Sequence, residues 1–177
     1  KDTENILSKK INRLQSFMQK RIDGVDLNTR FLLKFQQLSI ENATKKINGF
    51  NEGFAGFDQS KLSIKTLAKK SAQLAKKMDS ALSSGRLSSQ KITSINQQLI
   101  ALEKSFLEEK GMYFGAWYRS LYSASDPFSG YASWILPGLE YEIALKSSDR
   151  LKEWDDRYSA AIGRLNTKID GLSRSLN

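Results

Sequence analysis

Apolar residues recur at steps of three and four along most of the chain, with polar residues between them. This spacing places them on one face of a 3.6-residue helix and predicts a helix wherever it continues for several turns. Residues 3–22 are the first such segment, and 61–84, 89–107 and 149–175 repeat the pattern. The predicted buried positions of the last three segments are Ile64, Leu67, Leu74, Met78 and Leu82; Ile92, Ile95, Leu99, Leu102 and Phe106; and Leu151, Trp154, Tyr158, Ala161, Leu165, Ile169 and Leu172.

A further helix is predicted after Asp26. Its predicted buried side consists of Leu27, Phe31, Phe35 and Leu38. The pattern resumes at Ala43 and Ile47, so the segment is either one bent helix or two short ones. The stretch 50–57 then interrupts phenylalanines with glycines, and we interpret it as a loop held on the bundle by its rings.

Helices with such stripes bury them by packing nearly antiparallel at shallow crossing angles. No segment outside residues 117–139 alternates with period two for long, which argues against a sheet. The sequence therefore predicts an all-α fold: one domain over residues 1–177, built as an antiparallel four-helix bundle with a long irregular loop before the last helices.

Residues 117–139 form that irregular loop. They contain both prolines and two of the three tryptophans, and they show no helical period. A structureless stretch of about 20 residues is uncommon in a compact domain and is usually functional. Behind Pro137 and Gly138, residues 139–145 are predicted to form a short helix. The loop is the candidate functional segment.

The composition excludes several kinds of chemistry. The chain contains no histidine and no cysteine, which excludes a Ser-His-Asp triad and histidine-based zinc sites. We interpret the pairs Glu108–Glu109 and Asp155–Asp156 as solubilising charge, so no catalytic residue, metal ligand or cofactor is predicted here. Lys1 opens no signal peptide and no apolar run reaches the length of a membrane span, so any membrane anchor is expected outside this chain.

The net charge of +9 is concentrated in residues 60–110, which carry 10 basic and 4 acidic side chains. The basic stripe consists of Lys61, Lys65, Lys69, Lys70, Lys76 and Lys77. We favour a solvated helix face; an anionic membrane surface is the alternative. No aromatic residue interleaves the stripe to stack on bases, so no nucleic-acid partner is expected.

Asn42-Ala43-Thr44 matches the N-glycosylation pattern, with Asn42 as the acceptor, which favours a lumenal or extracellular setting.

The central loop carries a family resemblance. Tyr118-Arg119 is followed by Tyr131-Ala132 and, eighteen residues after the arginine, by Pro137-Gly138. With the upstream segment 96–106, this arrangement resembles the C-terminal helical domain of the transferrin receptor and glutamate carboxypeptidase II family, the transferrin receptor-like dimerisation domain. Residues 25–60 resemble an expansion between the first two family helices. The overall character of the sequence is similar to that of fungal family members associated with vacuolar protein sorting.

The resemblance implies a four-helix bundle that forms much of a homodimer interface and packs on a protease-like domain of the same polypeptide. Zinc would belong to that upstream domain, so this chain would be a non-catalytic C-terminal fragment of a larger membrane protein, on the lumenal or extracellular side of an endosome or vacuole. The parent is either an active zinc peptidase or a pseudoenzyme.

The resemblance also implies site residues. In peptidase members, a lysine–tyrosine pair of the loop contacts an acidic substrate side chain. Tyr131 matches the tyrosine, whereas the lysine position falls on Gly130 and the neighbouring Ser129 offers no cation. A preference of the parent for C-terminal glutamate is therefore not expected. The predicted interface residues are Trp117, Tyr118, Arg119, Trp134, Ile135, Leu136 and Pro137.

Three hypotheses follow from the sequence. The first, which we favour, is an assembly module that binds a second copy and its own protease-like domain. The second is the substrate-sensing lobe of a zinc peptidase, with Tyr131 in the site. The third is a basic helical surface for an anionic membrane.

Overall fold

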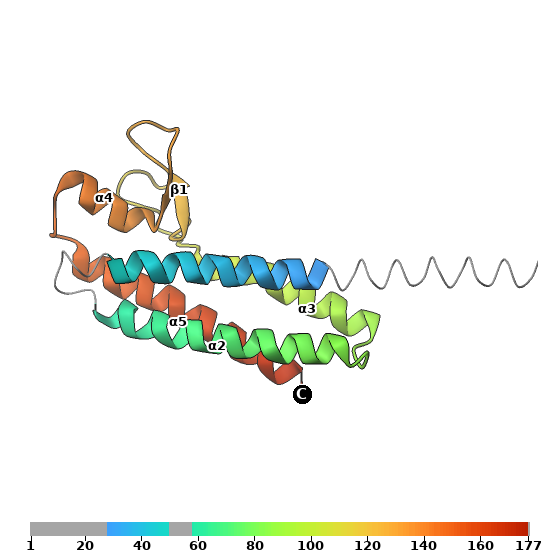
Figure 1. The fold of residues 1–177 in the computed structure, drawn as a ribbon. Helices are drawn as coiled ribbons and strands as arrows, with labels where there is room; N and C mark the ends of the chain where they lie inside the picture. Colours follow the sequence, from blue (N-terminus) through green and yellow to red (C-terminus); the bar gives the residue numbers. More distant parts are fainter. Residues whose placement is uncertain (1–27, 50–57, 177) are drawn as a thin grey trace, which may run out of the picture.

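The computed structural model describes residues 28–49 and 58–176, most of them helical (Figure 1). The long helices are the one that covers residues 28–49 (the 28–49 helix), α2 (Asp58–Ser83), α3 (Ser89–Ala101) and α5 (Leu151–Ser175). The short elements are the 3-10 helix η1 (Glu103–Phe106), the strands β1 (Ser123–Ser125) and β2 (Ser133–Ile135), and helix α4 (Pro137–Leu145). The predicted all-α bundle with an irregular segment before the last helices is confirmed. The predicted helix 3–22 and the loop 50–57 lie outside the described residues.

Successive long helices run in opposite directions, as predicted (Figure 1). The 28–49 helix and α3 run one way, and α2 and α5 run the other. Hydrogen bonds between α2 and α5 join Ser60 to Asp155, Ser63 to Ser159 and Lys70 to Asp170, so the two helices are parallel neighbours. A parallel pair needs a long connection, and α3 together with the irregular segment supplies it.

The predicted stripes of α2, α3 and α5 form the core. Most of the residues named for these helices are buried, and Leu82 packs against the core while half-exposed. Gly85 has φ +66° and its N–H bonds to the carbonyl of Leu82, which ends α2 close to the predicted boundary at residue 84. Helix α4 begins at Pro137 and not at Leu139, because proline suits the first turn of a helix.

The predicted buried face of the 28–49 helix is wrong in its first half, whereas the predicted positions Ala43 and Ile47 are buried. Phe31, Phe35 and Leu38 are exposed, whereas the buried residues are Thr29, Leu33, Gln36, Ile40, Ala43 and Ile47. Two polar residues lie in the core because α3 supplies partners: Thr29 donates to Asn96 Oδ1 at 2.6 Å and Gln36 to the Leu99 carbonyl at 3.3 Å. The helix is continuous to residue 49, and Leu27 lies outside the described residues.

Asp155 is not a solvated surface charge, which corrects the interpretation of the Asp155–Asp156 pair. The residue is 4% exposed, and its carboxylate accepts the backbone N–H groups of Gln59 at 3.1 Å and Ser60 at 2.8 Å. These N–H groups lie in the first turn of α2, where a helix has no internal acceptor for them. Asp156 is exposed and pairs only with Lys152, at 3.1 Å, among the described residues.

The lysines of the basic stripe on α2 differ in their exposure and in their contacts. Lys65, Lys69 and Lys76 are exposed, whereas Lys70 forms an ion pair with Asp170 of α5 at 2.6 Å. Over the part of the chain that the structure describes, no helix has the length and apolar character that crossing a bilayer requires. The membrane-surface hypothesis stays a prediction.

Replacing Asp155 with alanine should lower the free energy of unfolding by about 1–3 kcal/mol, because N–H groups at the start of α2 lose their acceptor in a buried setting. Asp156→Ala is the matched control and should change it by less than about 0.5 kcal/mol. Urea denaturation followed by circular dichroism measures both. Equal losses in the two variants would contradict the capping role of Asp155.

Candidate functional site: an aromatic surface at one end of the bundle

The segment between η1 and α5 is fastened to the bundle at its start. Leu121 donates its N–H to the Phe106 carbonyl, and Glu108 donates to that of Arg119, both at 2.8 Å. These two bonds close residues 108–119 into a loop. Leu121 is fully buried below it. Arg157 of α5 holds the loop from the other side through its ion pair with Glu108 at 3.5 Å.

Residues 122–136 form a hairpin that projects from the bundle (Figure 1). Strands β1 and β2 pair antiparallel, with Ala124 opposite Trp134. A further bond, from the Leu136 N–H to the Tyr122 carbonyl at 2.8 Å, extends the pairing toward the bundle. The sequence did not predict this hairpin, because each strand is only three residues long and β1 consists of small residues.

Asp126 organises the tip of the hairpin. Its carboxylate accepts the Ser129 hydroxyl at 2.6 Å and the Phe128 N–H at 2.8 Å, and its carbonyl accepts the Gly130 N–H at 2.8 Å. The hydrogen bond from Ser129, followed by that from Phe128, lowers the pKa of Asp126 below its usual value. Gly130 has φ +73°, a conformation that favours glycine.

The base of the hairpin is set into the core. Leu136, Pro137 and Gly138 are buried, and Leu136 has φ +55°. Gly138 donates its N–H to the Tyr158 hydroxyl at 3.1 Å, and a Cβ on Gly138 would lie 2.5 Å from the Trp154 ring. Burial raises the pKa of the Tyr158 hydroxyl above its usual range, so it remains a neutral partner for Gly138.

A buried carboxylate joins α4 to α5. Glu142 is fully buried and accepts Arg150 Nε at 2.7 Å and the Trp154 indole N–H at 3.0 Å. The Arg150 guanidinium lies 4.8 Å from the Tyr113 ring centroid and 5.7 Å from that of Tyr141. The sequence does not predict this cluster, since no spacing rule connects residues from two helices and a loop.

Exposed and half-buried aromatic rings gather on the loop, the hairpin and α4 over this framework. We define the aromatic surface as Tyr113, Phe114, Trp117, Tyr118, Phe128, Tyr131, Trp134 and Tyr141. Ring contacts run from Trp117 to Tyr118 (5.6 Å between centroids), on to Phe114 (4.9 Å) and Tyr141 (4.9 Å), and finally to Phe128 (6.0 Å). Trp117 is 77% exposed and Tyr131 98%.

The structure divides the predicted interface residues into three groups. Trp117 and Arg119 are exposed; Tyr118, Trp134 and Ile135 are half-buried; Leu136 and Pro137 are buried within this chain. The last two therefore hold the hairpin in place and present no surface to a partner. Sequence reasoning missed Phe128, which is largely exposed and stacks on Tyr141 with an interplanar angle of 12°.

The residues matched to a substrate pocket lie together at the hairpin tip. Ser129, Gly130 and Tyr131 are exposed, and the Tyr131 ring does not pack on the bundle.

Asn42 lies elsewhere, exposed on the 28–49 helix, where the Thr44 hydroxyl donates to the Ile40 carbonyl at 2.7 Å. Glycosylation of Asn42 stays a prediction. Within residues 28–49 and 58–176, no group of three or more acidic, histidine or cysteine side chains is placed to hold a metal ion.

One known protein family matches this sequence. The sequence profile of the transferrin receptor-like dimerisation domain matches residues 5–170. This range contains the hairpin, the aromatic surface and nearly all of α5. A search of curated proteins finds no significant match.

Gly138→Ala should lower the free energy of unfolding by about 1–3 kcal/mol, because the added methyl group overlaps the Trp154 ring. Gly163→Ala is the matched control: its Cβ meets nothing within 4 Å, in the middle of α5. That change should be neutral or stabilising by about 0.5–1 kcal/mol. Thermal and urea unfolding of both variants measure the difference. A Gly138→Ala protein as stable as the wild type would show that the hairpin base is not closely packed.

The order of the hairpin tip should depend on pH through Asp126. Because its pKa is lower in the folded tip, ionised Asp126 stabilises the tip at pH values above about 4 and the effect is lost as the pH falls through the lowered pKa. The Phe128 amide resonance, followed by NMR from about pH 6 to about pH 2, should shift with that pKa. Asp126→Asn should abolish this titration. A shift that persists in the variant would assign it to another group.

Proposed function

The chain belongs to the transferrin receptor-like dimerisation domain family, and from this premise we propose that it is the self-association module of a larger transferrin receptor- or glutamate carboxypeptidase-like protein. It binds a second copy of itself and the protease-like domain of its own polypeptide. Catalysis belongs to other domains of the parent, and any zinc ion is held there.

The observation that carries the proposal is the aromatic surface. Trp117 and Tyr131 are extensively exposed although both side chains have large apolar area, and Phe128 lies between them in the chain, also exposed. Tyrosine, tryptophan and arginine are the residues that most often dominate binding at interfaces, and Arg119 is exposed two residues after Trp117. A stable dimer buries about 1,200 Å² or more in total, and we expect this surface to contribute to that area together with a neighbouring helix face.

The framework below the aromatic surface supports rigid docking. The rings lie on a segment held to the bundle by the hydrogen bonds of Leu121 and Gly138 and by the ion pair of Glu108 with α5. Side chains that are already ordered lose less entropy when they bind, so more of the contact energy remains as affinity.

A second candidate function is favoured by one specific observation. Tyr131 points away from the bundle at a hairpin tip, which is the placement that a residue needs to reach into the site of an adjacent domain. Its hydroxyl would offer a neutral hydrogen bond to a substrate, with no cation from Gly130 or Ser129. Zinc-ligating His, Asp and Glu residues in the upstream sequence of the parent would favour this function over a purely structural one.

We place the parent on the lumenal or extracellular side of a membrane, in an endosome or vacuole, with a role in vacuolar protein sorting. The family resemblance and the Asn42 acceptor pattern support this setting. The exposed position of Asn42 on the 28–49 helix is compatible with a glycan.

Sedimentation equilibrium of the chain should show a monomer–dimer equilibrium. Trp117→Ala and Tyr131→Ala should each weaken dimerisation by about 30-fold, the factor expected for an interface residue worth about 2 kcal/mol. Both side chains are largely exposed, so the variants should keep the stability of the wild type.

Leu62→Ala is the matched control, because Leu62 is an equally exposed apolar residue on α2, outside the aromatic surface. It should leave the dimerisation constant unchanged. A wild-type chain that stays monomeric at high concentration would contradict self-association through this domain. Loss of the dimer in Leu62→Ala alone would move the interface to α2.

A further inference from the structure

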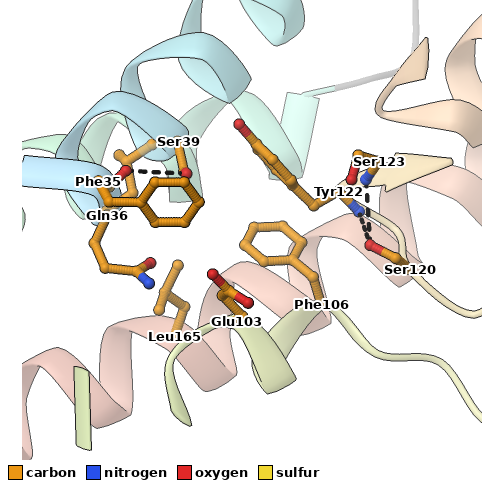
Figure 2. Close-up of a pocket in the computed structure, with 10 residues that line it drawn as sticks. Phe35, Gln36, Ser39, Glu103, Phe106, Ser120, Tyr122, Ser123 and Leu165 are labelled. Carbon is orange, nitrogen blue, oxygen red and sulfur yellow. Dashed lines mark hydrogen bonds between the residues drawn. The ribbon is translucent and has the colours of Figure 1, made fainter. Parts of the chain in front are cut away.

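A cavity of about 200 Å³ opens where the 28–49 helix, η1 and the start of the hairpin meet (Figure 2). The function proposed above does not use it. Its lining residues are Phe35, Gln36, Ser39, Ile40, Glu103, Phe106, Ser120, Tyr122, Ser123 and Leu165. The lining residues of the 28–49 helix are more than 60 residues from the other lining residues in the sequence, so the cavity is a product of the tertiary fold.

Three aromatic side chains surround the open space. Phe106 and Tyr122 contact each other with centroids 5.8 Å apart and an interplanar angle of 57°, so they form two walls set at an angle. Phe35 lies across the cavity from them, on the 28–49 helix (Figure 2). Phe35 is 44% exposed because Thr29 and Gln36 take the buried side of that helix.

A carboxylate completes the lining. In the described part of the chain, Glu103 has no ion pair or hydrogen bond, and the Tyr122 hydroxyl has no hydrogen bond. Figure 2 shows the Glu103 carboxylate between Leu165 and Phe106, at the side of the cavity. Two cations of α5 next to η1 are directed elsewhere: Arg164 Nε donates to the Ser105 carbonyl at 3.1 Å and Lys168 to the Ala101 carbonyl at 3.0 Å.

We propose that this cavity binds an organic cation of the quaternary ammonium class. Three rings and one carboxylate around a space of this size are the elements that hold such a group, because the faces of aromatic rings attract a weakly hydrated cation. The carboxylate of Glu103 neutralises the charge of the ligand. The Tyr122 hydroxyl can hydrogen-bond to a polar substituent on the ligand, such as the hydroxyl of choline.

An uncharged apolar ligand fits the cavity less well. It would cover the Glu103 carboxylate without offering it a partner, and removing a charge from water without a partner is unfavourable. An anion would be repelled by the same carboxylate. The charge of the lining therefore selects a cation, and the three rings favour one with an apolar shell over a hydrated metal ion.

The test is an NMR titration of the ¹⁵N-labelled chain with choline. Its neutral isostere, 3,3-dimethylbutan-1-ol, has the same shape without the charge and serves as the control ligand. Choline should shift the amide resonances of Glu103, Tyr122 and Ser123, with a dissociation constant on the order of 1 mM. The isostere should bind at least tenfold more weakly, and added salt should weaken choline binding because Glu103 is exposed.

Glu103→Gln should weaken choline binding at least tenfold, and Phe35→Leu, which replaces the ring with an apolar side chain, should weaken it severalfold. Glu109→Gln removes the same charge from an exposed residue of the 108–119 loop and should leave binding unchanged. Glu103 is exposed and Phe35 is 44% exposed, outside the core, so the two variants should fold.

Three results would overturn the proposal: equal binding of choline and its isostere, unchanged choline binding in Glu103→Gln, or no shift of the cavity amides at high choline concentration. Tighter binding of N-acetyl-lysine methylamide than of choline would also reject it, since the occupant would then be a protein side chain. The monomer–dimer equilibrium is measured separately, so failure of this proposal leaves the function proposed above untouched.

Discussion

The first turns of α5 make the contacts that hold both α2 and the hairpin in place. Trp154 packs on Gly138 and donates to Glu142, while Tyr158 accepts the Gly138 N–H. On another side of the same turns, Asp155 caps the start of α2. One short stretch of helix thus fixes both the parallel neighbour of α5 and the base of the hairpin, which explains why the irregular segment has a defined position.

This arrangement separates the aromatic residues into two groups with different roles. Trp154 and Tyr158 are buried, and their polar atoms are bonded to the chain itself. The rings of the aromatic surface lie farther out, on the loop, the hairpin and α4, where they are exposed or half-buried. Because the buried group orders the segment, the exposed group is presented without further folding, which favours binding to another protein surface.

Most of the bundle could be predicted from the sequence. The stripes of α2, α3 and α5 are long and regular, and a regular 3.6-residue period leaves one face for burial whatever the neighbours are. The same reasoning failed on the 28–49 helix, where two apolar periods compete. There the core side contains Thr29 and Gln36, whose side chains find acceptors in Asn96 and Leu99 on α3. Asp155 was misinterpreted for the same reason, since its partners lie about 95 residues away.

The sequence by itself determined the all-α class, the end of α2 next to Gly85, and the presence of an irregular, tryptophan-bearing segment before the last helices. These features depend on local spacing and on the backbone preferences of single residues. Only the tertiary structure decided which face of the 28–49 helix is buried, that residues 122–136 form a hairpin, and that Phe35, Glu103 and Tyr122 surround one cavity. Those outcomes depend on hydrogen-bond partners and neighbouring side chains that are distant in the sequence, and no local pattern encodes them.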